Sequence, residues 1–335
     1  MRRFLFFLVP VLLCIGGAGL WYTSYLTTGS SGSGEVIVVL PKGAGVRGIG
    51  ALLAANGILE NDIRYLCLVY FSGLKTRLQA GEYSIPLGLT PPEVLQLLAK
   101  GSTLRHHVTI PEGVTAEQIA SLFEKDGWIK RDRFLSLVQD IEFIKKLGID
   151  AVNLEGYLFP ETYTLVRHET NEPSVIRMMV DRFQVVWKEL NVQEAYGLNR
   201  HQLLTLASVV EKETGAAEER PLIARVFYNR LTRKMRLQSD PTVIYGIRDF
   251  NGNLTKADLK KETPYNTYVI PALPPGPICS PGRAALEAVL RPADSEALYF
   301  VSKNDGTHIF STNLKDHNQA VQVYQRRTVN DLRGQ

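Results

Sequence analysis

An uncharged stretch near the N-terminus constrains this chain more than any other feature. From Phe4 to Leu26 no charged residue interrupts a mostly apolar run. A helix that crosses the hydrocarbon core of a bilayer needs about 20 such residues, so the run is long enough to span a membrane. Its last third carries the aromatic residues expected at a membrane interface, Trp21, Tyr22 and Tyr25. We therefore predict a membrane-spanning helix over residues 4–26.

A cleaved signal peptide is the alternative interpretation of the same run. Signal peptidases need small residues after the apolar core, whereas Leu20 and Trp21 are bulky. Leu13 before Cys14 also fits a lipoprotein signal poorly, because a small residue is usual there. These residues favour an anchor that stays attached to the protein.

The residues on either side of the run predict its orientation. Arg2 and Arg3 precede it, and positive residues remain on the cytoplasmic side of a membrane. Residues 1–3 are therefore expected in the cytoplasm and the remainder outside it. The run is followed by "TTGSSGSG", residues 27–34, whose composition is typical of a flexible tether.

Composition excludes some classes of function. The formal net charge is +4 and is spread along the 335 residues, with no basic run that would favour nucleic acid as a partner. No CxxC or HExxH motif occurs, and the six histidines are scattered apart from His106-His107, so we expect no metal site and no cofactor. The spacing of Cys67 and Cys279 neither predicts nor excludes a disulfide.

Three segments share one pattern after the tether. They begin at Val36, Tyr83 and Val108, and each has a β-rich run, a proline, a glycine-containing turn and an amphipathic stretch. Proline and glycine are typical of a strand end followed by a turn. The expected helix starts are capped by Thr90 and Thr115, and the expected helix ends are at Gly57, Gly101 and Gly127. The sequence thus predicts strand–turn–helix units.

The first part of the exported region has a recognisable order of elements. We expect a strand, two helices and a second strand, at Val36–Leu40, Val46–Asn56, Glu60–Ser72 and Gly81–Ile85. This order resembles the LysM module, a small glycan-binding domain, and we place such a module over residues 35–103. The resemblance is one of architecture, and fold alone does not establish function.

The rest of the chain, residues 104–335, is expected to be mainly helical. Its periodicity predicts helices at Arg131–Leu147, Glu172–Leu190 and Arg200–Lys212. Near the C-terminus, "ALYFVS" and "THIFST" flank Asn304-Asp305-Gly306, which is typical of a β-hairpin.

Two carboxylates end one of these helical patterns, in "SVVEKETG". An apolar stripe of Leu203, Leu206, Ala207 and Val210 continues to Glu213, whereas Glu211 lies nearer its edge. Burial destabilises the charged form of a carboxyl and raises its pKa, as a general acid near neutral pH requires. The pattern alone leaves open an exposed turn in which these acids pair with nearby basic residues.

Several long blocks resemble the YceG-like family of endolytic murein transglycosylases. They are "EKETGAAEERPLIARVFYNRLTRKMRLQSDPTVIYG", "LEGYLFPETY", "YNTY", "LPPGPICSPG" and "HIFSTNLKDHNQAV", in the family's order. The resemblance implies an α+β protein with an N-terminal transmembrane helix, a LysM-like βααβ module, and a helix-rich, lysozyme-like transglycosylase domain with β-hairpin additions.

The resemblance also implies an activity and its setting. Such enzymes cut peptidoglycan glycan strands internally, between N-acetylmuramic acid and N-acetylglucosamine, and leave 1,6-anhydro ends. One glutamate suffices, followed by Ser or Thr, and Glu213-Thr214 matches this pattern whereas Glu211-Lys212 does not. The expected location is the bacterial inner membrane with the catalytic part outside the cytoplasm. A link to peptidoglycan synthases rests on the resemblance alone.

The mechanism inferred for such a site uses Glu213 twice, first as general acid and then as general base toward the C6 hydroxyl of the sugar. Candidate substrate-binding residues around it are Gln238, Asp240, Tyr245, Tyr265, Asn266, Tyr268 and Asn313. Glu155 and Glu161 are alternative acids in a block that we interpret mainly as the wall of a groove.

Two other functions remain open from the sequence. One is a membrane-anchored scaffold that binds the cell wall without cutting it. The other is a true hydrolase, which needs a second carboxylate across the cleft, and Asp240 is the candidate for that role.

Overall fold

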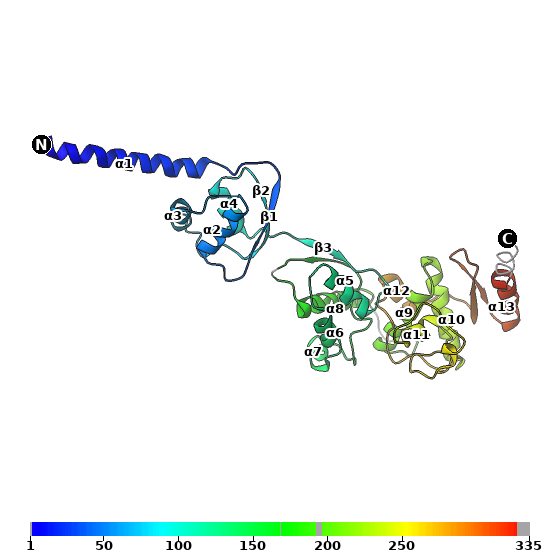
Figure 1. Cartoon of the computed structure of the whole chain (residues 1–335). Helices are drawn as coiled ribbons and strands as arrows, with labels where there is room; N and C mark the ends of the chain where they lie inside the picture. The colour runs from blue at the N-terminus through cyan, green and yellow to red at the C-terminus, as the bar shows by residue number, and fades with distance from the viewer. Residues whose placement is uncertain (1, 168, 192–195, 327–335) are drawn as a thin grey trace. The chain divides into compact units, whose positions relative to one another are not determined.

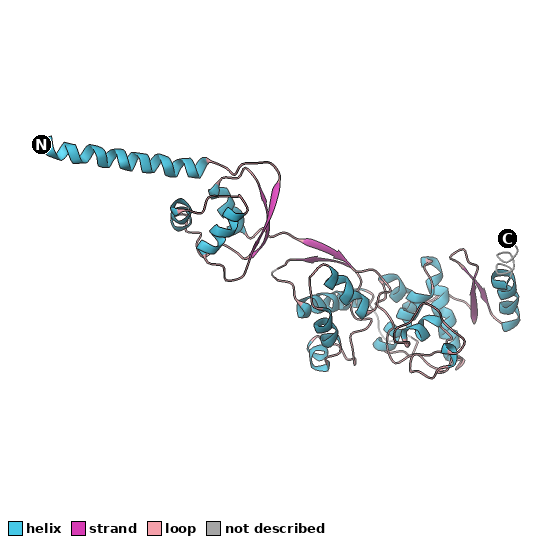
Figure 2. Cartoon of the chain, viewed as in Figure 1, coloured by secondary structure: helices cyan, strands magenta, loops and turns pink. Residues whose placement is uncertain are grey.

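The computed structural model describes residues 2–167, 169–191 and 196–326. The chain divides into two compact units, one of residues 1–107 with 164–170 and one of residues 108–163 with 171–335 (Figure 1). Helices dominate both units, and the strands form three two-stranded sheets among the described residues (Figure 2). This is a helix-rich α+β architecture, as expected.

Helix α1 (Arg2–Thr27) contains the N-terminal apolar run. In the described part of the chain it is the one helix long and apolar enough to cross a membrane, over Val9–Thr27. Apolar side chains from Val9 to Trp21 are exposed to the surroundings. These features are consistent with the predicted anchor.

The first unit continues with the predicted order of strand, helix, helix and strand. These elements are β1 (Glu35–Leu40), α2 (Val46–Ala55), α3 (Ile63–Phe71) and β2 (Gly81–Pro86), followed by α4 (Pro91–Lys100). Strands β1 and β2 pair antiparallel, with Val38 opposite Tyr83. Both side chains are buried in the core that the helices cover. The βααβ order is confirmed, and the likeness to a LysM module stays a prediction.

Residues 27–34 follow a defined path against this module, although their composition suggests a free tether. The amide of Gly88 donates to the hydroxyl of Ser30 at 2.8 Å, and the amide of Leu87 donates to the carbonyl of Gly34 at 2.8 Å. A Cβ at Gly29 would lie 2.1 Å from the carbonyl oxygen of Gly88. Glycine lets the two backbones approach closely enough for these contacts to form.

The three repeated segments all form the predicted strand and helix. The third uses β3 (His106–Thr109), which pairs with β4 (Thr162–Leu165), and α5 (Ala116–Lys125). Thr90 and Thr115 each form a capping box at the start of their helix. The predicted terminating glycines, Gly57, Gly101 and Gly127, all have φ near +70°. Glycine adopts this left-handed conformation without steric cost.

The helix expected over Arg131–Leu147 is two helices, α6 (Arg131–Val138) and α7 (Ile141–Lys146). Asp140 separates them because its carboxylate accepts hydrogen bonds from the amides of Glu142 and Phe143. Such a cap satisfies amides that the start of a helix leaves unpaired. Helix α8 (Glu172–Glu189) follows β4 and agrees with its prediction.

Helix α9 (Arg200–Glu213) lies at the centre of the second unit. It packs against α10 (Arg220–Thr232) and α12 (Arg283–Leu290), and α11 (Asp240–Tyr245) also contacts it. All residues from 203 to 210 are buried. The expectation of a single apolar stripe is therefore wrong for this helix, because neighbouring elements cover it on every side.

The C-terminal part completes the unit with a hairpin and a helix. Strands β5 (Tyr299–Ser302) and β6 (His308–Ser311) pair antiparallel, as predicted, and α13 (Leu314–Val321) follows. The turn between the strands places Asn304 at φ 62° and Gly306 at φ 88°. Short helical turns are η1 (Ala217–Glu219), η2 (Asp258–Lys260) and η3 (Gln322–Arg326).

Candidate active site

Glu213 is the last residue of α9, and its carboxyl lines a cavity of about 490 Å³. Thr214 leaves the helical conformation with φ −144° and ψ 140°, so the helix ends directly beyond the acid. The other walls of the cavity come from α10, the loop before α11, the β5–β6 hairpin and α13. A buried helix thus delivers one carboxyl to the edge of a hollow.

The hydroxyl of Ser239 donates a hydrogen bond of 2.5 Å to Oε1 of Glu213. Ser239 is buried, and its own amide donates to the hydroxyl of Thr267 at 2.9 Å. The hydroxyl of Thr242 donates to the carbonyl of Ser239 at 2.7 Å. These bonds hold Ser239 in place, and its hydroxyl in turn fixes Oε1 of Glu213.

The pKa of Glu213 is raised to about 7, mainly by burial and also by the nearby charge of Asp240. The hydrogen bond from Ser239 and the charge of Arg230 oppose this shift. Arg230 is itself buried and donates to the carbonyls of Leu298, at 2.7 Å, and Leu237. A carboxyl with its pKa raised in this way is able to hold its proton near neutral pH, as a general acid requires.

Glu211, two residues earlier, has a different environment. Its carboxylate pairs with Arg220 at 3.1 Å and accepts the amide of Gly282 at 2.9 Å. Only 5% of its side chain is exposed. The two carboxylates of "SVVEKETG" therefore diverge, one into a buried ion pair and one to the cavity.

Three of the predicted substrate-binding residues line the same cavity as Glu213. They are Gln238, Asp240 and Tyr268. The hydroxyl of Tyr268 donates to Oδ1 of Asp240 at 2.6 Å. Gln238 has φ 51°, a conformation that is uncommon outside glycine and places it at a sharp bend.

The four other predicted residues have structural partners and lie outside the lining of this cavity. Asn266 is fully buried, and its amide group donates to three carbonyls of the loop around η2. Asn313 caps α13 by accepting from the amide of Asp316. The rings of Tyr245 and Tyr265 pack together with centroids 4.8 Å apart.

Glu155 and Glu161 also lie outside the cavity lining. Glu155 is buried, accepts the amide of Ala116 at 3.0 Å, and receives the hydroxyl of Tyr245 at 3.1 Å. Burial raises the pKa of Glu155 to about 7. Glu161 pairs with Arg182. Cys67 and Cys279 are both free thiols.

The structure adds cavity residues that sequence reasoning missed, among them Arg230, Tyr299 and His317. The guanidinium of Arg230 lies 5.5 Å from the ring centroid of Tyr299, which stacks on His317. Burial lowers the pKa of His317, and its Nδ1 is buried without a partner among the described residues. The only sequence signal for Arg230 and His317 was their position within the blocks resembling one family, and Tyr299 lies outside those blocks. Within the described ranges no group of His, Cys, Asp and Glu is arranged to hold a metal ion.

Comparison with known proteins places this chain in a family. An endolytic murein transglycosylase of Bacillus subtilis is 32% identical over 329 residues, which cover 93% of this chain and 91% of that protein. One from Streptococcus pneumoniae serotype 2 is 32% identical over 95% of this chain and 64% of its own length.

A solved structure and a family model agree with these relatives. The 2.6 Å crystal structure of a yceG-like protein from Listeria monocytogenes matches with a TM-score of 0.57 and 31% identity, covering 86% of this chain and 99% of that one. The model of the YceG-like family matches residues 38–323. This chain therefore belongs to the YceG-like family.

Proposed function

We propose that this chain is an endolytic lytic transglycosylase of murein, which cuts glycan strands internally and leaves 1,6-anhydro-muramyl ends. One observation carries the proposal: the carboxyl of Glu213 lines a cavity and has its pKa raised to about 7. The activity named for the relatives supports the class of reaction.

In the proposed reaction Glu213 first donates a proton and then accepts one. Protonated Glu213 gives its proton to the glycosidic oxygen as the bond from that oxygen to C1 of the muramyl sugar breaks. The C6 hydroxyl of the same sugar then attacks C1, and its proton passes to the Glu213 carboxylate. The enzyme is thereby restored without a water molecule being consumed. Proton transfer by a positioned side chain contributes about 10² to 10⁴ in rate.

Ser239 has a positioning role in this proposal. Its hydroxyl donates a hydrogen bond to Oε1 of Glu213, so we assign the proton that Glu213 transfers to Oε2. Gln238, Asp240 and Tyr268 line the cavity and are proposed to bind sugar hydroxyls or N-acetyl groups. Tyr245, Tyr265, Asn266 and Asn313 are proposed to support these loops rather than to touch the glycan.

The proposed setting follows from the N-terminal part of the chain. Helix α1 anchors the protein in the inner membrane with the second unit outside the cytoplasm, because Arg2 and Arg3 precede the apolar run. The module of residues 35–103 is proposed to bind glycan in the manner of LysM domains. New strand ends are the product, so termination of nascent strands beside the peptidoglycan synthases is the proposed physiological role.

A second candidate is a hydrolase that uses Asp240 to activate water. The observation that favours it is the presence of Asp240 on the same cavity as Glu213. A transglycosylase has no need of that second carboxylate, because its nucleophile belongs to the substrate.

Digestion of purified murein separates these functions. The digest compares the parent protein with Glu213→Gln, Asp240→Asn and the control Glu218→Gln, an exposed acid outside the cavity lining. Mass spectrometry of the strand ends is the measurement. We expect anhydro ends from the parent and from Glu218→Gln, and none from Glu213→Gln. Reducing ends that disappear in Asp240→Asn indicate the hydrolase, and an absence of new ends from the folded parent indicates a scaffold.

A further inference from the structure

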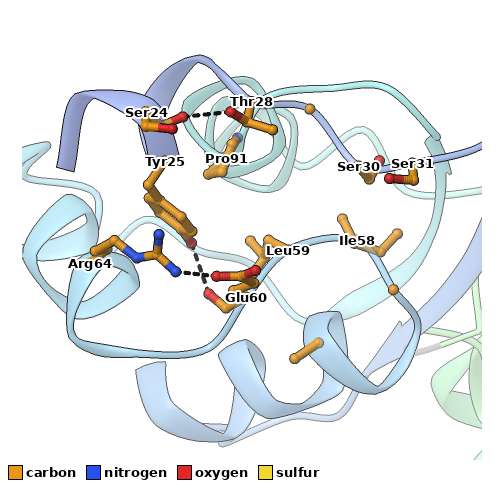
Figure 3. A pocket seen from close by; sticks show the side chains of 13 residues that line it. Ser24, Tyr25, Thr28, Ser30, Ser31, Ile58, Leu59, Glu60, Arg64 and Pro91 are labelled. Carbon is orange, nitrogen blue, oxygen red and sulfur yellow. Dashed lines mark hydrogen bonds and ion pairs between the residues drawn. The ribbon is translucent and has the colours of Figure 1, made fainter. Parts of the chain in front are cut away.

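A second and larger hollow lies in the first unit, where the end of α1 meets the module (Figure 3). We call it the anchor cavity, and its volume is about 650 Å³. Its walls are the last turn of α1, residues 28–31, the loop after α2, Arg64 of α3 and Pro91 of α4. The reaction proposed at Glu213 does not use it.

The end of α1 is fixed to the module at this cavity. The guanidinium of Arg64 lies 4.5 Å from the ring centroid of Trp21 and 4.7 Å from that of Tyr25. The hydroxyl of Tyr25 donates to the backbone carbonyl of Glu60 at 3.0 Å. Tyr25 is buried although it belongs to the apolar helix. These contacts make the hollow a preformed feature that stays with the outer end of the helix.

The position of the anchor cavity on the chain restricts which ligands are able to enter it. Ser24, Tyr25 and Thr28 belong to or directly follow the last turn of the helix that is long enough to span a bilayer. When α1 crosses a membrane, this turn lies in the layer of lipid headgroups. The cavity therefore opens among phospholipid headgroups, which are present there at very high local concentration.

The charges in the cavity select among headgroups. Glu60 has 75% of its side chain exposed, and only one of its oxygens pairs with Arg64. The C-terminal end of α2, where Ala54 lines the cavity, adds the negative end of a helix dipole. Both features favour the binding of a ligand that places a positively charged group beside Glu60.

An anionic group also has partners in the cavity. Nε and Nη2 of Arg64 are bound to Asp62 and Glu60, but Nη1 makes no hydrogen bond with the described residues. Hydroxyls of Ser30 and Ser31 line the opposite wall (Figure 3). Since Glu60, Asp62 and Arg64 together carry one net negative charge, a headgroup with phosphate alone is disfavoured.

We propose that the anchor cavity binds the headgroup of a zwitterionic phospholipid, with its phosphate toward Arg64 and the serine hydroxyls and its ammonium toward Glu60. Bound lipid ties the module to the membrane surface in addition to the chain connection. The proposal requires α1 to lie in a membrane and is independent of the chemistry at Glu213.

The test uses the full chain in bilayer nanodiscs made from equal parts of phosphatidylethanolamine, phosphatidylcholine and phosphatidylglycerol. Native mass spectrometry after gentle release identifies the lipid that stays bound. Two neighbouring residues give a matched pair of variants: Ala54 lines the cavity, whereas Ala55 is exposed and does not. Ala54→Phe fills the cavity, and Ala55→Phe adds the same ring outside it. Thermal unfolding checks that both variants are folded.

We expect the parent protein and Ala55→Phe to retain the zwitterionic lipids, phosphatidylethanolamine and phosphatidylcholine, in preference to phosphatidylglycerol, and Ala54→Phe to retain about tenfold less of them. Glu60→Gln is expected to lower this preference for zwitterionic headgroups by up to about fivefold, since an exposed charge pair contributes little. Equal retention by Ala54→Phe and Ala55→Phe overturns the site. Preferential retention of phosphatidylglycerol by the parent overturns the ligand class.

Discussion

Ser239 and Glu213 are 26 positions apart in sequence, and the serine hydroxyl donates to the glutamate carboxyl at 2.5 Å. The bond stabilises the carboxylate, whereas burial stabilises the protonated acid, and burial has the larger effect on the pKa. Glu213 is thereby left with a pKa of about 7 rather than a higher value, so it is able both to give and to accept a proton.

Ser239→Ala removes this hydrogen bond, and we expect two effects on murein cleavage. The value of kcat/KM falls about tenfold, because a hydrogen bond to a charged group contributes about 1.5 kcal/mol. The alkaline limb of the pH–rate profile, near pH 7 in the parent, moves to higher pH because the carboxylate loses a stabilising donor. Rates measured from pH 5 to 9 check both effects. Ser136→Ala, at an exposed site on α6, is the control. An unmoved alkaline limb in Ser239→Ala would show that the serine does not tune the acid.

Glu211→Gln tests the other carboxylate of the pair. Removing one partner of a buried ion pair leaves Arg220 without its counter-charge, and we expect a loss of about 3 kcal/mol in the free energy of unfolding. Denaturant titration measures this loss. Glu213→Gln is expected to show the opposite pattern, with activity abolished and stability at pH 8 retained, because the amide that replaces the carboxyl carries no buried charge. A catalytically dead but fully stable Glu211→Gln contradicts our assignment of the two roles.

The raised pKa of Glu155 leads us to predict that the stability of the protein depends on pH. Its pKa is raised to about 7 in the folded protein from an ordinary value near 4.5, so the folded state holds a proton that the unfolded state has released. The contribution of this carboxyl to the free energy of unfolding is therefore greatest below about pH 4.5. It is lost as the pH rises from 4.5 through 7. The loss for one such group is about 3 kcal/mol. Thermal melts between pH 5 and 8 measure it. In Glu155→Gln the fall with pH is expected to be smaller, and an unchanged fall argues against Glu155 as its source.

Gly29→Ala tests the contact between residues 27–34 and the module. The added Cβ would lie 2.1 Å from the carbonyl oxygen of Gly88, so the segment must move away from the turn after β2. We expect faster limited proteolysis within residues 27–34. Gly45→Ala is the control, because no atom lies within 4 Å of a Cβ there and φ is −73°. Equal cleavage rates in the two variants would mean that the segment is not held.

Local patterns were sufficient for many elements because the interactions that define them are local. Thr90 and Thr115 cap helices through residues three positions away, and Gly57 ends a helix through its own backbone conformation. The split at Asp140 was missed because an apolar period continues across it, while the cap that ends one helix and begins the next depends on a single carboxylate.

The sequence by itself determined the apolar N-terminal run, the order of strand, helix, helix and strand over residues 36–85, and the placement of two carboxylates at the end of one helix. Tertiary structure alone decided which carboxylate meets a cavity and which meets Arg220, because Ser239, Arg230 and Gly282 reach α9 from distant parts of the chain. It also decided that Asn266 and Asn313 hold loops and a helix start rather than line the cavity. The pKa of a carboxyl depends on its burial and on nearby charges, which come from residues distant in sequence. A pattern along the chain does not predict which of these residues contact each side chain.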